Sequence, residues 1–396
     1  MAKVLYFSYD GLLDPLGQSQ IVPYISAIAA AGHSQTIVSY EKVERPQEQI
    51  QLMKNKLQNI GVCWIRLEFK SGKFWVLKRF VSGVLLIRKL CRHIQPDFIH
   101  LRGFVPSIIF QLSRSRVPHL YDFRSFALGE WVDIGKINPS SLLYRILNSL
   151  DKKVVRSASG LVVLEQSAKR LLEEIYDVPN VPLKVIRTCT DVKRYRTREN
   201  SVYKERSTLR FVFLGGARFP YQPDLALRLL QCLINRGLNC QIDFINERDH
   251  IFIESAIDHV GISRDRIKIL ASDHYKIPDL LATYDCGFIA YDSSKWRRVC
   301  SPTKLGEYLA AGLPVISLEG IDITDELSET TSCVLTVSRE ELEGGFQQNR
   351  VDQIIRFIQR PGVGRRCQQL AREEFNLDTA GKLYSELYAE VEARIL

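Results

Sequence analysis

Several features that define other classes of protein are missing from this sequence. Its nine cysteines form no Cys-x-x-Cys pair, and no Cys and His residues stand at the spacing typical of a metal site. The apolar run at residues 84–87 is far shorter than the ~20 residues that cross a bilayer. The amino terminus has no charged region followed by a longer apolar stretch, as a secretory signal would have. We therefore expect a cytoplasmic chain with reduced thiols that is neither secreted nor inserted across a membrane.

The composition also excludes fibrous and disordered chains. Only 15 of the 396 residues are Pro and 23 are Gly, while 45% are hydrophobic and 25% are charged. This balance is ordinary for a folded protein with large buried cores. With about 150 residues per domain as a guide, the length predicts two to three domains.

Positive charge is concentrated in the first half of the chain. The net charge is +9, and residues 1–190 contain 26 Lys and Arg but only 15 Asp and Glu. Between Lys54 and Arg92, ten basic residues accompany a single acid, Glu68. Such a one-sided field attracts an anionic partner.

Two stretches repeat the alternation of a short strand, a Gly-containing turn and an amphipathic helix, which is typical of parallel sheets with helical crossovers. We predict an α/β fold of two domains, residues 1–190 and 209–396, joined by a polar linker at 191–208. Helices are expected at residues 18–31 and 223–236, and as a pair over 364–396. The predicted strands are residues 4–8, 35–39, 97–101, 119–123, 161–164 and 184–186 in the first domain and 210–214, 241–245, 267–269, 287–291 and 315–317 in the second.

The most informative segment is residues 300–316, which read CSPTKLGEYLAAGLPVI. Ser301 suits a helix N-cap and Pro302 the first helical position. Gly312 ends the helix before a predicted strand. The segment therefore predicts a short helix with a well-defined start at the carboxyl edge of the second sheet.

The start of this helix is predicted to bind a nucleoside diphosphate. The amides of Thr303, Lys304 and Leu305 lack partners at a helix start, where the helix dipole also favours an anion. Lys304 adds a positive charge, and Glu307 can accept two hydrogen bonds from ribose hydroxyls. The alternative is a purely structural helix on which Lys304 and Glu307 form an exposed ion pair. Gly306 weighs against it, because a glycine inside a helix costs roughly 1 kcal/mol relative to Ala and suggests a close approach.

Residues 301–316 resemble the signature of the retaining glycosyltransferases of family 4, which have the two-domain GT-B fold. Residues 9–20 (YDGLLDPLGQSQ), 122–124, 189–191 and 371–375 (AREEF) agree with the same family. The resemblance implies two Rossmann-like domains facing across a cleft, with C-terminal helices that cross back to the first domain. It also implies transfer of a sugar from a nucleotide-sugar donor to a hydroxyl acceptor, with retention and without a metal or other cofactor.

The sequence departs from the family pattern at two places. Family members commonly carry two glutamates eight positions apart, and here Val299 occupies the position eight residues before Glu307. The missing glutamate usually lies near the donor sugar, while Glu307 matches the one that holds the ribose. The loop after the strand 210–214 offers Arg218 as a cation that could share the diphosphate with Lys304. An ordinary solvated arginine is the alternative for Arg218.

Three further candidates are placed by the predicted strands. Gly17 and Gly216 follow the first strand of each domain, where a glycine lets a donor approach the backbone, although a plain turn explains Gly17 equally well. Asp122 lies at the carboxyl edge of the first sheet, where open α/β sheets bind ligands, and is expected to orient a hydroxyl of the acceptor or the sugar. A structural turn between Asp122 and Arg124 is the alternative. His100, at the end of a neighbouring strand, is expected to be a packing residue.

The basic stretch at residues 69–92 interleaves Lys and Arg with aromatic and aliphatic residues. That combination suits a helix on an anionic membrane, at the inner face, or one that grips an anionic or lipid-linked acceptor. A half-buried crossover helix with a charged outer face has the same pattern. Because no recognition motif accompanies these residues, a nucleic-acid partner is not expected.

Catalysis by such a site requires stabilisation of the charge that develops on the departing diphosphate, here by Arg218, Lys304 and the nearby amides. The diphosphate can itself accept the proton of the acceptor hydroxyl, so no separate base is needed. Two alternatives stay open. One is a sugar-nucleotide epimerase, which shares the two-domain arrangement. The other is a non-catalytic sugar-nucleotide-binding partner, which the replacement of a glutamate by Val299 favours.

Overall fold

The computed structural model describes residues 1–69, 72–196 and 208–395. They form two compact units: the first comprises Met1–Arg187 and Leu377–Leu396, and the second comprises Thr188–Asn376. The units differ from the predicted domains at both borders. Residues 188–196, which include the start of the predicted linker 191–208, belong to the second unit, and the last helix belongs to the first. Linker residues 197–207 lie outside the described residues.

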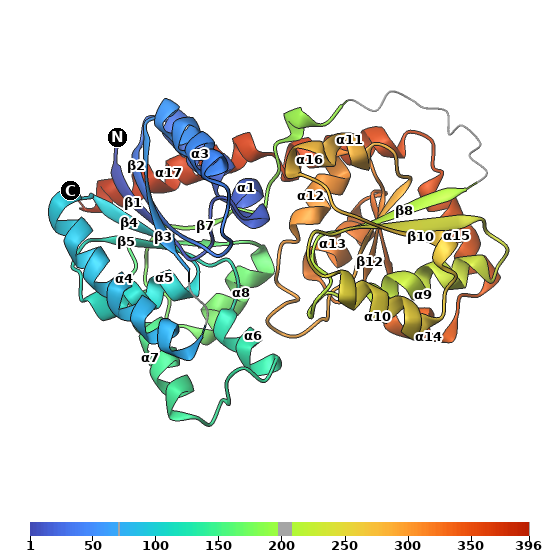
Figure 1. The fold of residues 1–396 in the computed structure, drawn as a ribbon, viewed down its shortest axis with the longest axis horizontal. Helices are drawn as coiled ribbons and strands as arrows, with labels where there is room; N and C mark the ends of the chain where they lie inside the picture. The colour runs from blue at the N-terminus through green and yellow to red at the C-terminus, as the bar shows by residue number, and fades with distance from the viewer. Residues whose placement is uncertain (70–71, 197–207, 396) are drawn as a thin grey trace. The chain divides into compact units, whose positions relative to one another are not determined.

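The first unit is built on a seven-stranded parallel sheet (Figure 1). Its strands are mostly buried apolar runs, as expected when helices cover both faces of a parallel sheet. In spatial order they are β3 (Val62–Glu68), β2 (Ser34–Glu41), β1 (Lys3–Ser8), β4 (Phe98–Arg102), β5 (His119–Asp122), β6 (Gly160–Val163) and β7 (Leu183–Val185).

The strand order of this sheet reverses direction between β1 and β4, so right-handed crossovers place the helices on two faces. Helices α2 and α17 pack together on one face, whereas α5 packs between α4 and α7 on the other. The helices are α1 (Pro15–Gln20), α2 (Val22–Ala30), α3 (Gln47–Asn59), α4 (Lys73–Ile94), α5 (Phe104–Ser113), α6 (Ala127–Asp133), α7 (Leu142–Arg156), α8 (Gln166–Ile175) and α17 (Leu377–Ile395).

The second unit has a six-stranded parallel sheet with the order β10-β9-β8-β11-β12-β13. Two clusters of buried apolar side chains pack on its strands. Its strands are β8 (Leu209–Leu214), β9 (Cys240–Ile245), β10 (Ile267–Leu270), β11 (Cys286–Ile289), β12 (Val315–Leu318) and β13 (Val334–Val337). Its helices are η1 (Val192–Arg194), α9 (Pro223–Ile234), α10 (His250–Val260), η2 (Arg264–Arg266), η3 (His274–Lys276), α11 (Ile277–Leu281), α12 (Thr303–Ala310), α13 (Asp322–Thr330), α14 (Arg339–Gly344), α15 (Gln348–Ile358) and α16 (Val363–Glu374).

The predicted α/β class is confirmed, since both sheets are parallel and alternate with helices. The predicted strands all form, but β3 and β13 were not predicted. The predicted helix at 18–31 is divided at Ile21 into α1 and α2. Of the two predicted C-terminal helices, α17 crosses back to the first unit and α16 stays in the second. Within the described ranges, no helix has both the length and the apolar character needed to span a bilayer.

Candidate functional site

Helix α12 lies at the centre of the candidate site in the second unit. Its residues from Lys304 to Ala310 are all buried. The Tyr308 hydroxyl accepts a hydrogen bond from the amide of Leu214 at the end of β8, at 2.7 Å. This contact holds the end of β8 against the helix. The loop that follows is close to Lys304 as well, since a Cβ atom built on Gly215 would lie 3.9 Å from Lys304 Nζ. Gly215, directly after β8, and the predicted Lys304 are therefore neighbours.

The Lys304 amine is buried without a hydrogen-bond partner in the part of the chain that the structure describes. The residue is 5% exposed, and Nζ lies 4.3, 4.8 and 5.4 Å from the ring centroids of Phe213, Tyr221 and Tyr291. Burial lowers the pKa of Lys304 to about 7, against the attraction of the nearby Glu307 carboxylate. Buried polar groups nearly always have a hydrogen-bond partner, so this amine is available to donate hydrogen bonds to an anion. The sequence did not indicate the three aromatic rings.

Glu307 lies one turn along α12 and is also buried. Burial raises the pKa of its carboxyl group to about 7, and the positive charges of Arg194 and Lys304 act in the opposite direction. Arg194 is held in place by His274, whose Nε2 lies 2.7 Å from Nη1 and whose carbonyl oxygen lies 2.9 Å from Nη2. The sequence analysis missed Arg194, because it falls in the predicted linker and no motif marks it.

The start of α12 differs from the prediction by one residue. The N-cap is Pro302, so the prediction of Ser301 as the cap is wrong. The Ser301 hydroxyl instead accepts a hydrogen bond from the Thr188 amide at 3.1 Å. The Leu305 amide donates to the Pro302 carbonyl at 3.0 Å, which leaves Thr303 and Lys304 as the amides that can face a ligand.

Arg218 is exposed and already has an anionic partner. Its side chain is 64% exposed, and Nε lies 2.7 Å from Asp249 Oδ1. The guanidinium also lies 5.0 Å from the ring centroid of Phe252. Since Asp249 additionally accepts a hydrogen bond from the Ala217 amide, the pair fixes the loop after β8. Asp249 would therefore compete with a diphosphate for the charge of Arg218.

The predicted glycines are explained by contacts within the protein. A Cβ atom on Gly17 would lie 1.8 Å from the Gly11 carbonyl oxygen, so the close packing of this turn requires a glycine at this position. A Cβ atom on Gly216 would lie 2.7 Å from the ring of Tyr221, one of the rings around Lys304. The close approach inferred at Gly306 comes from Phe375, which would lie 3.2 Å from an added Cβ.

Asp122 belongs to the first unit and is fully buried, with 0% exposure. Its Oδ2 accepts a hydrogen bond from the Tyr384 hydroxyl at 3.0 Å and lies 3.3 Å from His100 Nε2. Arg102 and Arg124 are within 3.7 and 3.5 Å of the carboxylate. Burial alone would raise the pKa of Asp122, but Arg124, His100 and Arg102 together hold it well below its usual range. Asp122 therefore cannot touch a substrate directly in this arrangement.

The packing role expected for His100 is supported because both of its ring nitrogens contact other side chains of the first unit. Nδ1 lies 2.6 Å from the hydroxyl of Tyr388, on the same helix as Tyr384. Burial lowers the pKa of His100, which favours the neutral ring, while the hydrogen bond to Asp122 opposes this shift. The sequence analysis missed both tyrosines, because α17 lies far from β4 and β5 along the chain.

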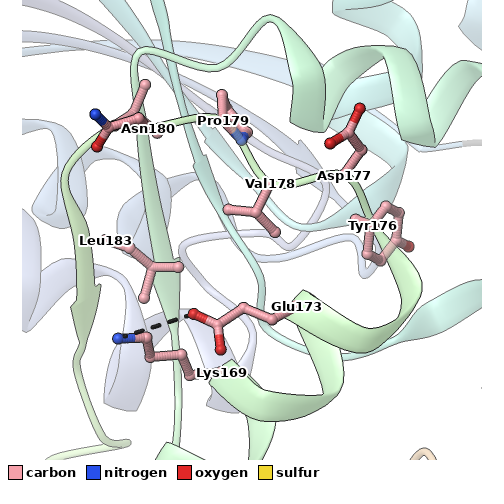
Figure 2. A pocket seen from close by; sticks show the side chains of 9 residues that line it. Lys169, Glu173, Tyr176, Asp177, Val178, Pro179, Asn180 and Leu183 are labelled. Atoms are coloured by element: carbon pink, nitrogen blue, oxygen red, sulfur yellow. Dashed lines mark ion pairs between the residues drawn. The ribbon is translucent and has the colours of Figure 1, made fainter.

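A separate pocket of about 440 Å³ lies in the first unit beside α8 and β7 (Figure 2). Lys169 and Glu173 in its wall pair with each other, with 3.9 Å between Nζ and Oε1. None of the predicted site residues lines this pocket. Across the described ranges, no cluster of three or more His, Cys, Asp or Glu side chains is placed to hold a metal ion.

Residues 19–189 match the model of the glycosyl transferase 4-like domain. This match confirms the resemblance to the glycosyltransferases of family 4 over the greater part of the first unit. No relative was found for the chain among curated protein sequences.

Solved structures show the same fold at low sequence identity. Sucrose-phosphate synthase from Thermosynechococcus elongatus matches with a TM-score of 0.72 and 14% identity over 100% of both chains. HepE from Anabaena, solved with UDP-glucose, matches with a TM-score of 0.68 and 16% identity over 98% of this chain and 100% of its own. A putative UDP-N-acetylglucosamine 2-epimerase from Listeria monocytogenes matches with a TM-score of 0.57 and 13% identity over 96% of this chain and 94% of its own. The predicted GT-B fold is thus confirmed.

Proposed function

We propose that this protein is a glycosyltransferase that moves a sugar from a nucleoside-diphosphate sugar to a hydroxyl acceptor with retention. The observation that carries the proposal is the buried, unpartnered amine of Lys304 at the start of α12, beside the Gly215 turn. A diphosphate would supply the missing acceptor oxygens to this amine and to the amides of Thr303 and Lys304. Glu307, one turn further on, would accept hydrogen bonds from the ribose hydroxyls.

In the proposed reaction the acceptor oxygen bonds to C1 of the donor sugar on the face from which the diphosphate departs. The bond between C1 and the diphosphate oxygen breaks, and the acceptor proton moves to the diphosphate. Lys304 stabilises the negative charge that develops on the leaving group, and Arg218 joins it after releasing Asp249. We propose that the transferred group is a hexosyl unit and that the reaction needs no metal. Activity should then persist in the presence of a chelator.

The decisive experiment is calorimetric titration with free nucleoside diphosphates. A thermal-shift screen first selects the base, since a ligand at about 100 times its Kd adds about 2.7 kcal/mol of stability. The variant Glu307→Gln should then bind the selected diphosphate about tenfold more weakly, because an amide holds the ribose hydroxyls less well than a carboxylate. Equal affinity in the two proteins would contradict the ribose role.

The epimerase alternative is kept because the chain shares its fold with a putative epimerase at a TM-score of 0.57. An epimerase would convert the donor when no acceptor is present, whereas a transferase would leave the sugar unchanged. Nuclear magnetic resonance of the product separates these outcomes and also shows the configuration at C1. Tight binding of the nucleotide sugar without turnover of any acceptor in a broad panel would instead indicate a non-catalytic sugar-nucleotide-binding protein. The buried Val299, which stands where the family commonly has a glutamate, favours this alternative.

We also propose that the enzyme works in the cytoplasm, at the inner face of the membrane, on an anionic or lipid-linked acceptor. The predicted membrane contact is the basic stretch 69–92, of which residues 70 and 71 lie outside the described residues. Its remaining residues form most of α4, whose Lys and Arg residues support attraction to an anionic surface.

A further inference from the structure

Helix α4 carries apolar side chains on its solvent face. Leu77, Val81 and Leu85 are 67%, 53% and 58% exposed, and their spacing of four residues aligns them in one stripe. Phe80 lies on the inner side and packs against the apolar cluster formed with α5. A solvated crossover helix would carry polar residues along its outer stripe. The pattern in the sequence therefore reflects two apolar faces, one packed and one uncovered.

Helix α7 repeats this arrangement on the same side of the first sheet. Leu142, Leu143 and Ile146 are 73%, 59% and 47% exposed. Tyr144 and Leu147, on the inner side of α7, pack into the same cluster as Phe80. The exposed residues of the two helices therefore face away from one shared core, with α5 between the helices.

Each exposed group begins toward one edge of the sheet. Because all strands are parallel, each crossover helix begins at the carboxyl edge. Leu77 lies near the start of α4, and Leu142 is the first residue of α7. Asp122 ends β5 at this same edge, where open sheets of this kind bind ligands.

The exposed charges of α4 and α7 themselves have one sign, whereas neighbouring α6 carries the exposed Asp133. Helix α4 contains no Asp or Glu. The acid of α7, Asp151, is 2% exposed and accepts a hydrogen bond from the Tyr121 hydroxyl at 3.0 Å, so it does not reach the surface. The basic residues, in contrast, lie in solvent: Lys78, Arg88, Lys89, Arg92, Arg145 and Lys153 are exposed.

We propose that this surface, the α4–α7 face, docks on a lipid bilayer that contains anionic lipid. Its exposed Leu, Ile and Val residues would enter the head-group region, and its Lys and Arg residues would meet the lipid phosphates. The inference rests on the membrane contact proposed above for residues 69–92 and extends it to α7. An anionic polysaccharide would leave the leucines in water. A second copy of the chain would bring two strongly basic faces together.

Vesicle flotation without donor or acceptor tests the proposal. The protein should float with vesicles of phosphatidylcholine and phosphatidylglycerol, but not with phosphatidylcholine alone. The double variant Leu142→Ser, Leu143→Ser should lower the vesicle partition coefficient at least tenfold, because two exposed leucines lose their apolar contact with lipid. The double variant Lys78→Gln, Lys89→Gln should lower the partition coefficient about fivefold per lysine. Added salt should also lower the partition coefficient of the unmodified protein.

The matched control is Leu52→Ser, an equally exposed leucine (61%) on α3, which the crossover geometry places on the opposite face of the sheet. It should bind vesicles like the unmodified protein. If the Leu142, Leu143 variant also binds normally while the lysine variant does not, α7 has no role and the contact stays with residues 69–92.

Two further measurements separate the remaining outcomes. Lys304→Ala, which is expected to lose sugar transfer, should float like the unmodified protein, so a failed transferase proposal would leave vesicle binding intact. If the unmodified protein does not float, the docking proposal is overturned. Light scattering that shows a dimer, dissociated by the Leu142, Leu143 variant, would assign the face to a second copy and overturn it as well.

Discussion

The two units each bury a charged group at the carboxyl edge of their sheet, but they surround it differently. Asp122 is enclosed by His100, Tyr384 and two arginines, so its charge is compensated within the protein. Lys304 is equally buried, yet its amine lies over aromatic rings without a hydrogen-bond acceptor among the described residues. A compensated charge holds a fold together, whereas an uncompensated one indicates a missing ligand. The comparison supports a structural role for the first cluster and the binding role that we propose for the second.

The largest expected effect is on stability, at Asp122. The variant Asp122→Ala should lower the free energy of unfolding by about 3–5 kcal/mol, because it leaves two buried arginines without their shared partner. Urea denaturation measures this change. Binding of a nucleoside diphosphate to the folded variant should be normal. A stable variant that has lost only turnover would instead give Asp122 a direct role in the reaction.

The second effect is on activity, at Lys304. The variant Lys304→Ala should lower the rate of sugar transfer on the order of a hundredfold or more, because it removes charge stabilisation from the leaving diphosphate. Its free energy of unfolding should not fall as that of Asp122→Ala does, since the Lys304 amine has no hydrogen-bond partner among the described residues that the substitution would leave unsatisfied. Parallel assays of sugar transfer and urea denaturation check both statements. Unchanged turnover would reject the proposed diphosphate site at the start of α12.

A smaller effect is expected at Arg218. The variant Arg218→Ala should reduce transfer about tenfold, less than Lys304→Ala, because an exposed cation in high dielectric stabilises charge less than a buried one. Arg236→Ala, on the same unit but bonded to the Phe346 carbonyl at 2.9 Å, is the control. A larger loss at Arg218 than at Lys304 would reverse the ranking of the two cations.

The last prediction concerns the dependence of stability on pH. Between pH 4.5 and about 7 the folded protein keeps a proton on Glu307 that the unfolded chain has lost, so stability should fall as pH rises. Between about 7 and 10.5 the unfolded chain keeps a proton on Lys304 that the folded protein has lost, so stability should rise. The slopes should reach at most about 1.4 kcal/mol per pH unit.

Denaturation at a series of pH values measures this curve. The double variant Lys304→Met, Glu307→Gln removes both groups and should lose the minimum near pH 7. A saturating nucleoside diphosphate should flatten the upper part of the curve, because a bound anion keeps Lys304 protonated. An identical minimum in the double variant would assign the curve to other groups.

Much of the fold and part of the site could be predicted from local sequence. Pro302 and Gly312 bracket α12 so closely that the helix was placed within one residue. Lys304 and Glu307 could be named because they occupy fixed positions relative to that start. Strand β3 was missed because its residues are partly exposed at the edge of the sheet, where continuous apolar burial is not required.

The remaining features depend on contacts between distant parts of the chain. Tyr384 donates a hydrogen bond to Asp122, which lies 262 positions earlier in the sequence, and no local sequence pattern indicates such a pair. A Cβ atom on Gly216 would meet the ring of Tyr221, so this glycine also has a packing requirement that no local pattern indicates. The exposure of Leu142 could not be read from the sequence either, because an apolar helical stripe is usually buried.

The return of α17 to the first unit also constrains the order in which the protein can be completed during synthesis. The ribosome releases β4 and β5 long before Tyr384 and Tyr388, so His100 and Asp122 must wait for nearly the whole chain before their partners arrive. Until then the nascent first unit carries a partly compensated charge in its centre. The second unit, continuous from Thr188 to Asn376, can fold in that interval.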